Sequence, residues 1–266
     1  MKKTIINVLK QIELNENIEI LYACEAGSRV WGFSRKDSDY DVRFIYKKAK
    51  SSDYLSLKNE RDVIEYEADN LDIVGWDIRK ALAMHYKNNP QLREWLLSDI
   101  TYIDKDICDI FKGLGDFDRN MLMNHYSSIA YSHWRRYSTL EFNRNKTKKY
   151  LHIIRSILCW NLLNLDIYPP VKIQDLLEND SVKISCQTKC DIIDLIEYHR
   201  QLKDEISEDT MFRIHNFILK SLKVMKKVNV NSVKEIEDYD ERLREVLNIA
   251  ENGNAVDESD FSSKFP

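Results

Sequence analysis

The sequence predicts an α+β protein in which a small α/β unit comes first and an all-helical region follows. Segments with the short alternating or fully apolar pattern of strands are confined to the first 100 residues. After residue 104, apolar side chains recur almost everywhere at helical spacing. With 266 residues, of which 43% are hydrophobic, the chain can bury one large core or two modest ones.

The N-terminal unit is expected to begin with one helix and four strands. Residues 3–12 have the spacing of a short amphipathic helix. Residues 18–25 alternate and then become fully apolar, which indicates a strand that runs into a turn at Gly27-Ser28. Gly75 is expected to end the last of the other strands, which are predicted over residues 40–47, 63–67 and 71–74.

Helices are expected from Asp77 onward. Asp77 is a suitable N-cap for a helix that Asn88-Asn89-Pro90 ends, and a short helix follows near Trp95. A rigid turn is expected at Tyr168-Pro169-Pro170. Longer helical patterns cover residues 118–142, 146–165, 188–204 and 208–227, and a charged surface helix is expected over 234–250.

The turn Gly113-Leu114-Gly115 is the predicted domain boundary. It divides the chain into an N-terminal domain over residues 1–115 and a helical domain over 116–250, and residues 251–266 are expected to form a flexible tail.

Composition excludes several classes of protein. A net charge of −4 is too small for a general polyanion binder, so any nucleic-acid contact must come from a local patch. The absence of an 18-residue apolar run argues against a membrane protein, and the N-terminus lacks the pattern of a signal peptide. Five scattered cysteines argue against a disulfide framework and favour a reducing, cytoplasmic location.

Two carboxylates, Asp39 and Asp41, are the most informative feature of the sequence. Their spacing places both on one side of a strand, and Tyr40 points away. Paired carboxylates suit magnesium, which prefers hard oxygen ligands and substrate phosphates. The upstream Gly27-Ser28 turn offers backbone N–H groups that could close around a phosphate. The alternative is a solvated strand whose acids face water.

A third acid on another strand favours the functional interpretation. Asp72 lies inside an apolar strand, where an unpaired carboxylate would be costly, so a functional partner is the simplest explanation. Asp77 has a simpler role as a helix cap. We therefore select Asp72 from the five candidates Glu65, Glu67, Asp69, Asp72 and Asp77.

A basic stretch over residues 135–155 is the second candidate for a binding surface. Lys148, His152 and Arg155 share one face of the predicted helix, which indicates a phosphate clamp with Lys148 on a triphosphate and Arg155 beside it. An extended basic surface from Arg135 could track an RNA backbone. The alternative is a solvated face. The cations of this stretch are Arg135, Arg136, Arg144, Lys146, Lys148, Lys149 and Arg155.

Two roles are open for Arg29, which follows the Gly27-Ser28 turn. It could bind a phosphate or cap the local structure. Trp31 and Phe33 are expected to pack rather than to stack on a base.

The histidines are scattered along the sequence, which does not support a histidine nucleophile or a zinc hydrolase. His152 is of interest because it lies on the basic face.

Three segments resemble the DNA polymerase beta-like nucleotidyltransferase superfamily. Within it, they are similar to predicted bacterial and phage nucleotidyltransferases associated with RNA ligases. The segments are Gly27 to Tyr46, Gly75 to Leu82 with Asn89-Pro90, and Lys148 to Leu151 with Arg155. The resemblance covers most of residues 18–170. It implies a small mixed sheet with flanking helices, completed by the helical domain at a nucleotide cleft.

The resemblance also implies transfer of a nucleoside monophosphate from an NTP, taken here as ATP, to a hydroxyl acceptor, with magnesium or manganese as cofactor. Ser28 and the Gly27 backbone would hold the β- and γ-phosphates. Asp39 and Asp41 would hold the metals, and Asp72 would bind the second metal and help to deprotonate the acceptor.

The acceptor is open at this point. The basic stretch favours an RNA end, as in RNA repair or modification. The alternatives are a protein hydroxyl, as in an antitoxin-like or regulatory adenylylating enzyme, and a non-catalytic module that binds nucleotide or RNA. Neither the base preference, nor the oligomeric state, nor the role of residues 180–266 follows from the sequence.

Overall fold

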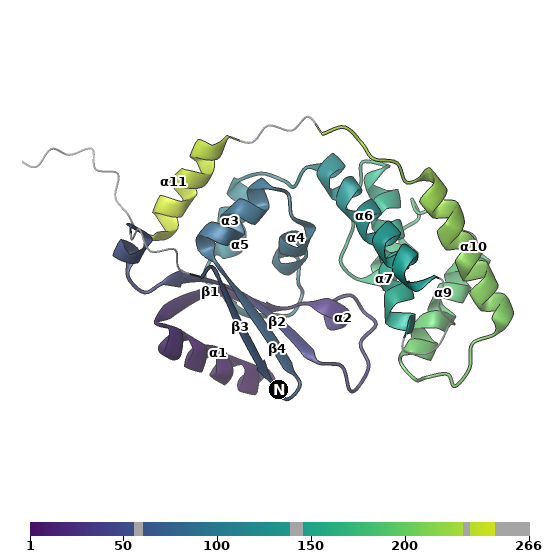
Figure 1. Ribbon diagram of the computed structural model, residues 1–266, viewed down its shortest axis with the longest axis horizontal. Helices are drawn as coiled ribbons and strands as arrows, with labels where there is room; N and C mark the ends of the chain where they lie inside the picture. The colour runs from purple at the N-terminus through teal and green to yellow at the C-terminus, as the bar shows by residue number, and fades with distance from the viewer. Residues whose placement is uncertain (56–60, 139–145, 231–234, 248–266) are drawn as a thin grey trace, which may run out of the picture.

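The computed structural model describes residues 1–55, 61–138, 146–230 and 235–247, and the predicted tail over 251–266 lies outside them. Figure 1 shows a sheet with one helix on one face and several on the other, and a second group of helices beyond them. This arrangement confirms the predicted α+β class.

The sheet is mixed, as expected, and has five strands in the order β3-β4-β2-β1-β5. The central strands β2 and β4 pair in parallel, and the other three pairings are antiparallel. The strands are β1 (Ile18–Glu25), β2 (Tyr40–Lys48), β3 (Val63–Ala68), β4 (Leu71–Asp77) and β5 (Thr101–Asp104).

Strand β5 was not predicted, because it has only four residues and none of them is buried, so its sequence carries little apolar signal. The prediction that Gly75 ends a strand was wrong. Strand β4 continues to Asp77, and Gly75 lies where a Cβ atom would be 2.1 Å from the ring of Phe44. The glycine is present because the aromatic ring of the neighbouring strand passes over its backbone.

The two faces of the sheet are covered differently (Figure 1). Helix α1 (Lys2–Glu16) packs Ile5, Leu9 and Ile12 against one face. The other face joins a larger core that runs from Leu21 to Leu247 and includes most of the later helices. The two predicted domains therefore share one continuous hydrophobic core.

The predicted cap at Asp77 is confirmed, and Asn89 caps the next helix, a role that was not predicted. The Asp77 carboxylate accepts a hydrogen bond from the backbone N–H of Arg79 at 2.8 Å, and Asn89 accepts one from Gln91 at 2.8 Å. The helices after β1 are α2 (Gly27–Val30), α3 (Ile78–Tyr86), α4 (Pro90–Leu96), α5 (Ile107–Gly113), α6 (Arg119–Tyr137), α7 (Thr147–Leu163), α8 (Ile173–Glu178), α9 (Cys186–His199), α10 (Glu208–Val224) and α11 (Ile236–Leu247).

Helix α11 is present where a charged surface helix was predicted, but it also buries three residues in the core. Figure 1 shows it beside α3, away from α10, so the chain returns to the N-terminal unit. The hydroxyl of Tyr239 lies 2.7 Å from Nδ1 of the buried His85. Lys47 Nζ and Ser51 Oγ donate to the last carbonyls of the helix, those of Val246 and Leu247.

The close approach at Gly75 gives a first prediction. Gly75→Ala should lower the free energy of unfolding by about 1–3 kcal/mol, because the new methyl group must displace the buried Phe44 ring. Urea denaturation measures this change. Gly113→Ala is the matched control, since its Cβ atom would meet only the end of the Arg242 side chain, at 3.3 Å. An unchanged midpoint for Gly75→Ala would contradict the packing described here.

Candidate active site

Two of the three predicted acids face each other across the centre of the sheet. The parallel register of β2 and β4 sets Asp41 directly opposite Asp72. The third, Asp39, lies one residue before β2 and is exposed to solvent, so the strand itself begins at Tyr40. The strand pairing thus brings Asp41 and Asp72 together and leaves Asp39 at the entrance of the strand.

Arg43 bridges Asp41 and Asp72, and sequence reasoning missed it. Its Nη2 lies 3.2 Å from Asp41 Oδ1 and 2.8 Å from Asp72 Oδ2. Its Nη1 donates to the backbone carbonyl of Asp72 at 2.8 Å and to that of Val42 at 3.0 Å. Strand alternation is the signal that could have found it, because residues 41 and 43 lie on the same face.

The Asp41 carboxylate is electrostatically stressed. Burial raises its pKa above the ordinary range, and the neighbouring Asp72 carboxylate raises it further. The charges of Arg43 and Lys148 oppose that shift. Because two like charges disfavour ionisation of both groups, a cation between the Asp41 and Asp72 carboxylates stabilises the ionised pair.

Gly27 begins α2 beside Asp41. Its φ angle is 63°, and a Cβ atom there would lie 2.0 Å from Asp41 Oδ2, so no other residue fits without moving the acid. Ala26 fixes the approach by donating its N–H to the Asp41 carbonyl at 2.8 Å. The predicted turn is thus a short helix start, and Ser28 within it is 2% exposed.

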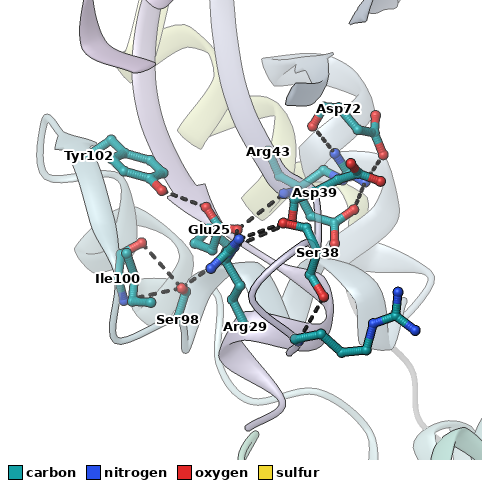
Figure 2. A network of polar contacts seen from close by, with 11 residues as sticks. Glu25, Arg29, Ser38, Asp39, Arg43, Asp72, Ser98, Ile100 and Tyr102 are labelled. Carbon is teal, nitrogen blue, oxygen red and sulfur yellow. Dashed lines mark hydrogen bonds and ion pairs between the residues drawn. The ribbon is translucent and has the colours of Figure 1, made fainter. Parts of the chain in front are cut away.

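Glu25, which sequence reasoning also missed, contacts the backbone of Asp41, and Figure 2 shows it between Tyr102 and Arg29. This fully buried carboxylate accepts hydrogen bonds from the backbone N–H of Asp41 at 3.1 Å and from the Tyr102 hydroxyl at 2.5 Å. Burial raises its pKa, which the hydrogen bond from Tyr102 and the nearby charge of Arg29 counteract. Its signal in the sequence was only a charged residue at the end of an apolar strand.

Arg29 makes the contacts expected of the local capping role, and its phosphate role stays a prediction. Its guanidinium donates to the carbonyl oxygens of Ser38 at 2.5 Å and Asp39 at 3.3 Å, and it lies 3.7 Å from the centre of the Tyr40 ring. Figure 2 shows Arg29 between Glu25 and the Ser38-Asp39 backbone. Arg29 therefore ties the segment that carries Asp39 to the start of α2.

A cleft of about 210 Å³ lies between this acidic group and the basic helix. Asp41 and Arg43 line one part of it, beside the Gly27 backbone, and α4 contributes further residues. Three residues of α7 that were predicted to bind nucleotide line the cleft as well. They are Lys148, Lys149 and His152. The two sequence regions that suggested a phosphate site thus meet at one cleft.

His152 is held neutral in this cleft. Burial and then the charge of Arg155 lower its pKa to about 3. Its ring packs edge-on against Trp31 at 4.4 Å between centroids, and Trp31 also lies 5.8 Å from Phe33. A neutral imidazole is suited to hydrogen bonding rather than to pairing with a phosphate charge. The packing role expected for Trp31 and Phe33 is consistent with these contacts.

Arg155, which was predicted to lie beside a phosphate, is engaged in contacts within the protein. Its Nη1 lies 2.8 Å from Glu94 Oε1, its Nε donates to the Val171 carbonyl at 2.9 Å, and it is 5% exposed. Glu94 also accepts hydrogen bonds from Trp31 Nε1 at 2.8 Å and from the Tyr126 hydroxyl. A buried guanidinium needs a carboxylate partner, and α4 supplies it, which joins α7 to the N-terminal unit.

The rest of the basic stretch is only partly described. Arg135 and Arg136 are exposed near the end of α6, and Arg144 lies outside the described residues. Within residues 1–55, 61–138, 146–230 and 235–247, no helix is long and apolar enough to cross a membrane.

The acids fit a divalent cation, although they do not form a ready cluster. Across the described part of the chain, no three or more His, Cys, Asp or Glu side chains gather as a metal-binding group. However, one oxygen from Asp41 and one from Asp72 converge on a single nitrogen of Arg43. A position where two carboxylate oxygens already surround a positively charged group is chemically suited to magnesium.

Parallel central strands with facing acids, a glycine at the adjoining helix start and a basic helix across the cleft place the molecule among polymerase beta-like nucleotidyltransferases. The chain belongs to the RNA repair pathway DNA polymerase beta family (RlaP), whose model matches residues 1–248. The resemblance noted in the sequence is thereby confirmed.

The proteins that are similar to this chain include one from Bacillus subtilis and one of known structure. The uncharacterized protein YcgL of Bacillus subtilis (strain 168) is 38% identical over 223 residues, which cover 82% of this chain and 84% of YcgL. A crystal structure of a nucleotidyltransferase-like protein from Exiguobacterium sibiricum 255-15 is 17% identical and has a TM-score of 0.28, covering 92% of this chain and 80% of the other.

The buried pair gives a second prediction. Arg155→Met should lower the free energy of unfolding by about 3–5 kcal/mol, because it leaves the Glu94 carboxylate without its cation. Urea denaturation at neutral pH measures the change. Lys148→Met, on the exposed part of the same helix, is the control and should shift stability by less than about 0.5 kcal/mol. Wild-type stability of Arg155→Met with lost nucleotide binding would instead support a phosphate clamp.

Proposed function

We propose that this chain is a magnesium-dependent nucleotidyltransferase that transfers a nucleoside monophosphate from an NTP to a hydroxyl group at an RNA end. The observation that carries the proposal is the cleft in which Gly27 and Asp41 face Lys148 and Lys149. Asp41, which pairs across the strands with Asp72, offers a carboxylate for a metal there, and the lysines offer cations for phosphates, which is the combination that phosphoryl chemistry requires.

The triphosphate lies between the two walls of the cleft in this proposal. The N-terminal N–H groups of α2, which begins at Gly27, face one end of it, and Lys148 and Lys149 neutralise its charge from α7. Because Arg29 and Arg155 are engaged elsewhere, the lysines are the principal phosphate ligands. His152 is neutral and borders the same space, where it orients a substrate oxygen by hydrogen bonding.

Asp39, Asp41 and Asp72 are the residues that would hold magnesium, and manganese is the alternative with the same ligand preference. When bound, the metal supplies charge neutralisation at the attacking and leaving oxygens. Asp41 is the best placed of the three, since its backbone is held by Ala26 and by Glu25. The fixed backbone keeps its carboxylate aimed into the cleft.

The reaction is an in-line displacement at the α-phosphorus. The acceptor hydroxyl oxygen forms a bond to the α-phosphorus, and the bond from that phosphorus to the bridging oxygen of the β-phosphate breaks. Pyrophosphate leaves with the electron pair of the broken bond, and the hydroxyl proton passes to a carboxylate, for which Asp72 is proposed. Orientation and electrostatic stabilisation are the main contributions of the protein in such a transfer.

An RNA acceptor is supported by two observations. The family is described by its part in an RNA repair pathway. Arg135 and Arg136 are also exposed near the end of α6, a helix that packs along the length of α7, which carries the cleft lysines. Exposed cations that continue from a catalytic cleft can follow a phosphate backbone without reading its bases.

The third prediction concerns the acids. Asp41→Asn should lower the rate of label transfer from an α-³²P-labelled NTP to an RNA oligonucleotide by at least about 100-fold, since it removes a charge that stabilises the transition state. Each of the four NTPs is tested in turn, with ATP as the expected donor. Asp37→Asn is the matched control, because this acid is exposed and pairs with Arg35 in the same loop.

Two results of that assay would count against the proposal. Failure of the wild-type protein to label any acceptor while it binds NTP normally would show that it is not an active transferase. Transfer of the label to a protein rather than to RNA would retain the enzyme and replace the acceptor. A γ-labelled NTP should transfer nothing, because the γ-phosphate leaves with pyrophosphate.

The fourth prediction tests the RNA surface. Arg135→Gln/Arg136→Gln should weaken binding of single-stranded RNA and reduce the slope of log affinity against log salt by about 0.7 for each lost phosphate contact. Fluorescence anisotropy over a range of salt concentrations measures both. Lys3→Gln/Lys10→Gln removes two exposed cations of α1, which packs on the face of the sheet away from α6, and should leave the slope unchanged. Equal effects of the two double variants would rule out a dedicated RNA path at α6.

A further inference from the structure

The Arg43 guanidinium fills the point at which the Asp41 and Asp72 carboxylates converge. Both acids approach the same atom, Nη2, at 3.2 and 2.8 Å. A divalent cation bound by those two oxygens would sit about 2.1 Å from each, inside the space that Nη2 takes up. Arg43 and a metal ion therefore exclude each other at this position.

Arg43 is firmly held rather than loosely docked. Its other terminal nitrogen, Nη1, donates to the carbonyl oxygens of Val42 and Asp72, and the side chain is only 12% exposed. Moving it away breaks charge-assisted hydrogen bonds and leaves two acids facing each other. A metal ion alone must therefore compete with an internal cation.

A triphosphate changes that competition. Arg43 lines the same cleft as Gly27 and Lys148, so a phosphate bound there lies within reach of its guanidinium. An arginine that gives up a carboxylate can then pair with a phosphate, for which its planar group is well suited. The carboxylate contacts that Arg43 loses to a metal ion are therefore replaced only when the nucleotide is present.

We propose that Arg43 is a positioning residue that acts as a resident counterion. It holds Asp41 and Asp72 in register in the metal-free protein, yields its place to the metal, and moves to the phosphates of the incoming NTP. Metal and nucleotide thus bind cooperatively, because each removes a cost of binding the other. The nucleotide half of this inference rests on the function proposed above.

The test is calorimetric titration of Arg43→Gln and wild-type protein with MgCl₂ in the absence of nucleotide. Removal of the competing charge should lower the half-saturating magnesium concentration by about tenfold. It should also lower the melting temperature of the metal-free protein, which loses the counterion between its acids. Repeating the titration with the non-hydrolysable analogue α,β-methylene-ATP should tighten magnesium binding much more in the wild type than in Arg43→Gln.

Two further variants complete the experiment. Arg61→Gln removes an exposed arginine that pairs with Glu16, so it changes net charge equally and should bind magnesium as the wild type does. Arg43→Lys keeps one charge but cannot bridge both acids, and it should bind magnesium with intermediate affinity and remain testable if Arg43→Gln does not fold. Magnesium binding by Arg43→Gln or Arg43→Lys that is equal to or weaker than wild-type binding would overturn the inference.

Failure of this inference and failure of the proposed function give different results. If wild type and Arg43→Gln transfer nucleotide but bind magnesium identically, Arg43 is no counterion while the function stands. If magnesium binding tightens as expected and no nucleotide is transferred to any acceptor, the counterion role stands and the proposed activity is wrong.

Discussion

Two carboxylates face each other across the parallel β2-β4 pair, and several neighbouring groups offset their mutual repulsion. Arg43 places a guanidinium between Asp41 and Asp72, and the backbone of Asp41 is tied down by Glu25 and Ala26. Such an arrangement costs stability compared with an apolar strand pair. Asp41 of this pair lines the cleft beside Lys148 and Lys149, which is the position that the proposed function requires.

A second charged contact joins elements on both sides of the cleft. Glu94 of α4 binds Arg155 of α7 and Trp31 of the loop after α2, so one carboxylate connects three elements that border the cleft. The pair is largely buried, which keeps it from exchanging freely with solvent ions. The basic helix is therefore tied to α4 and to Trp31 by contacts within the protein itself.

Local patterns revealed part of this site, and pairing across the fold decided the rest. Asp41 and Asp72 were found because strand spacing and an acid within an apolar segment are visible in a single sequence. The bridging role of Arg43 was not found, because it depends on the register between β2 and β4. Arg155 was assigned to phosphate since its partner Glu94 is 61 residues away in the chain. Strand β5 was missed because none of its residues is buried.

Helix α11, at the end of the described chain, packs on the N-terminal unit and completes its core. The side chain of Tyr239 covers the buried His85 of α3, and Lys47 and Ser51 bind carbonyls at residues 246 and 247. During synthesis, the sheet and α3 emerge from the ribosome long before this cover exists. A nascent chain that stops after α10 therefore exposes part of its core at α3, which quality-control proteases can recognise in place of a finished enzyme.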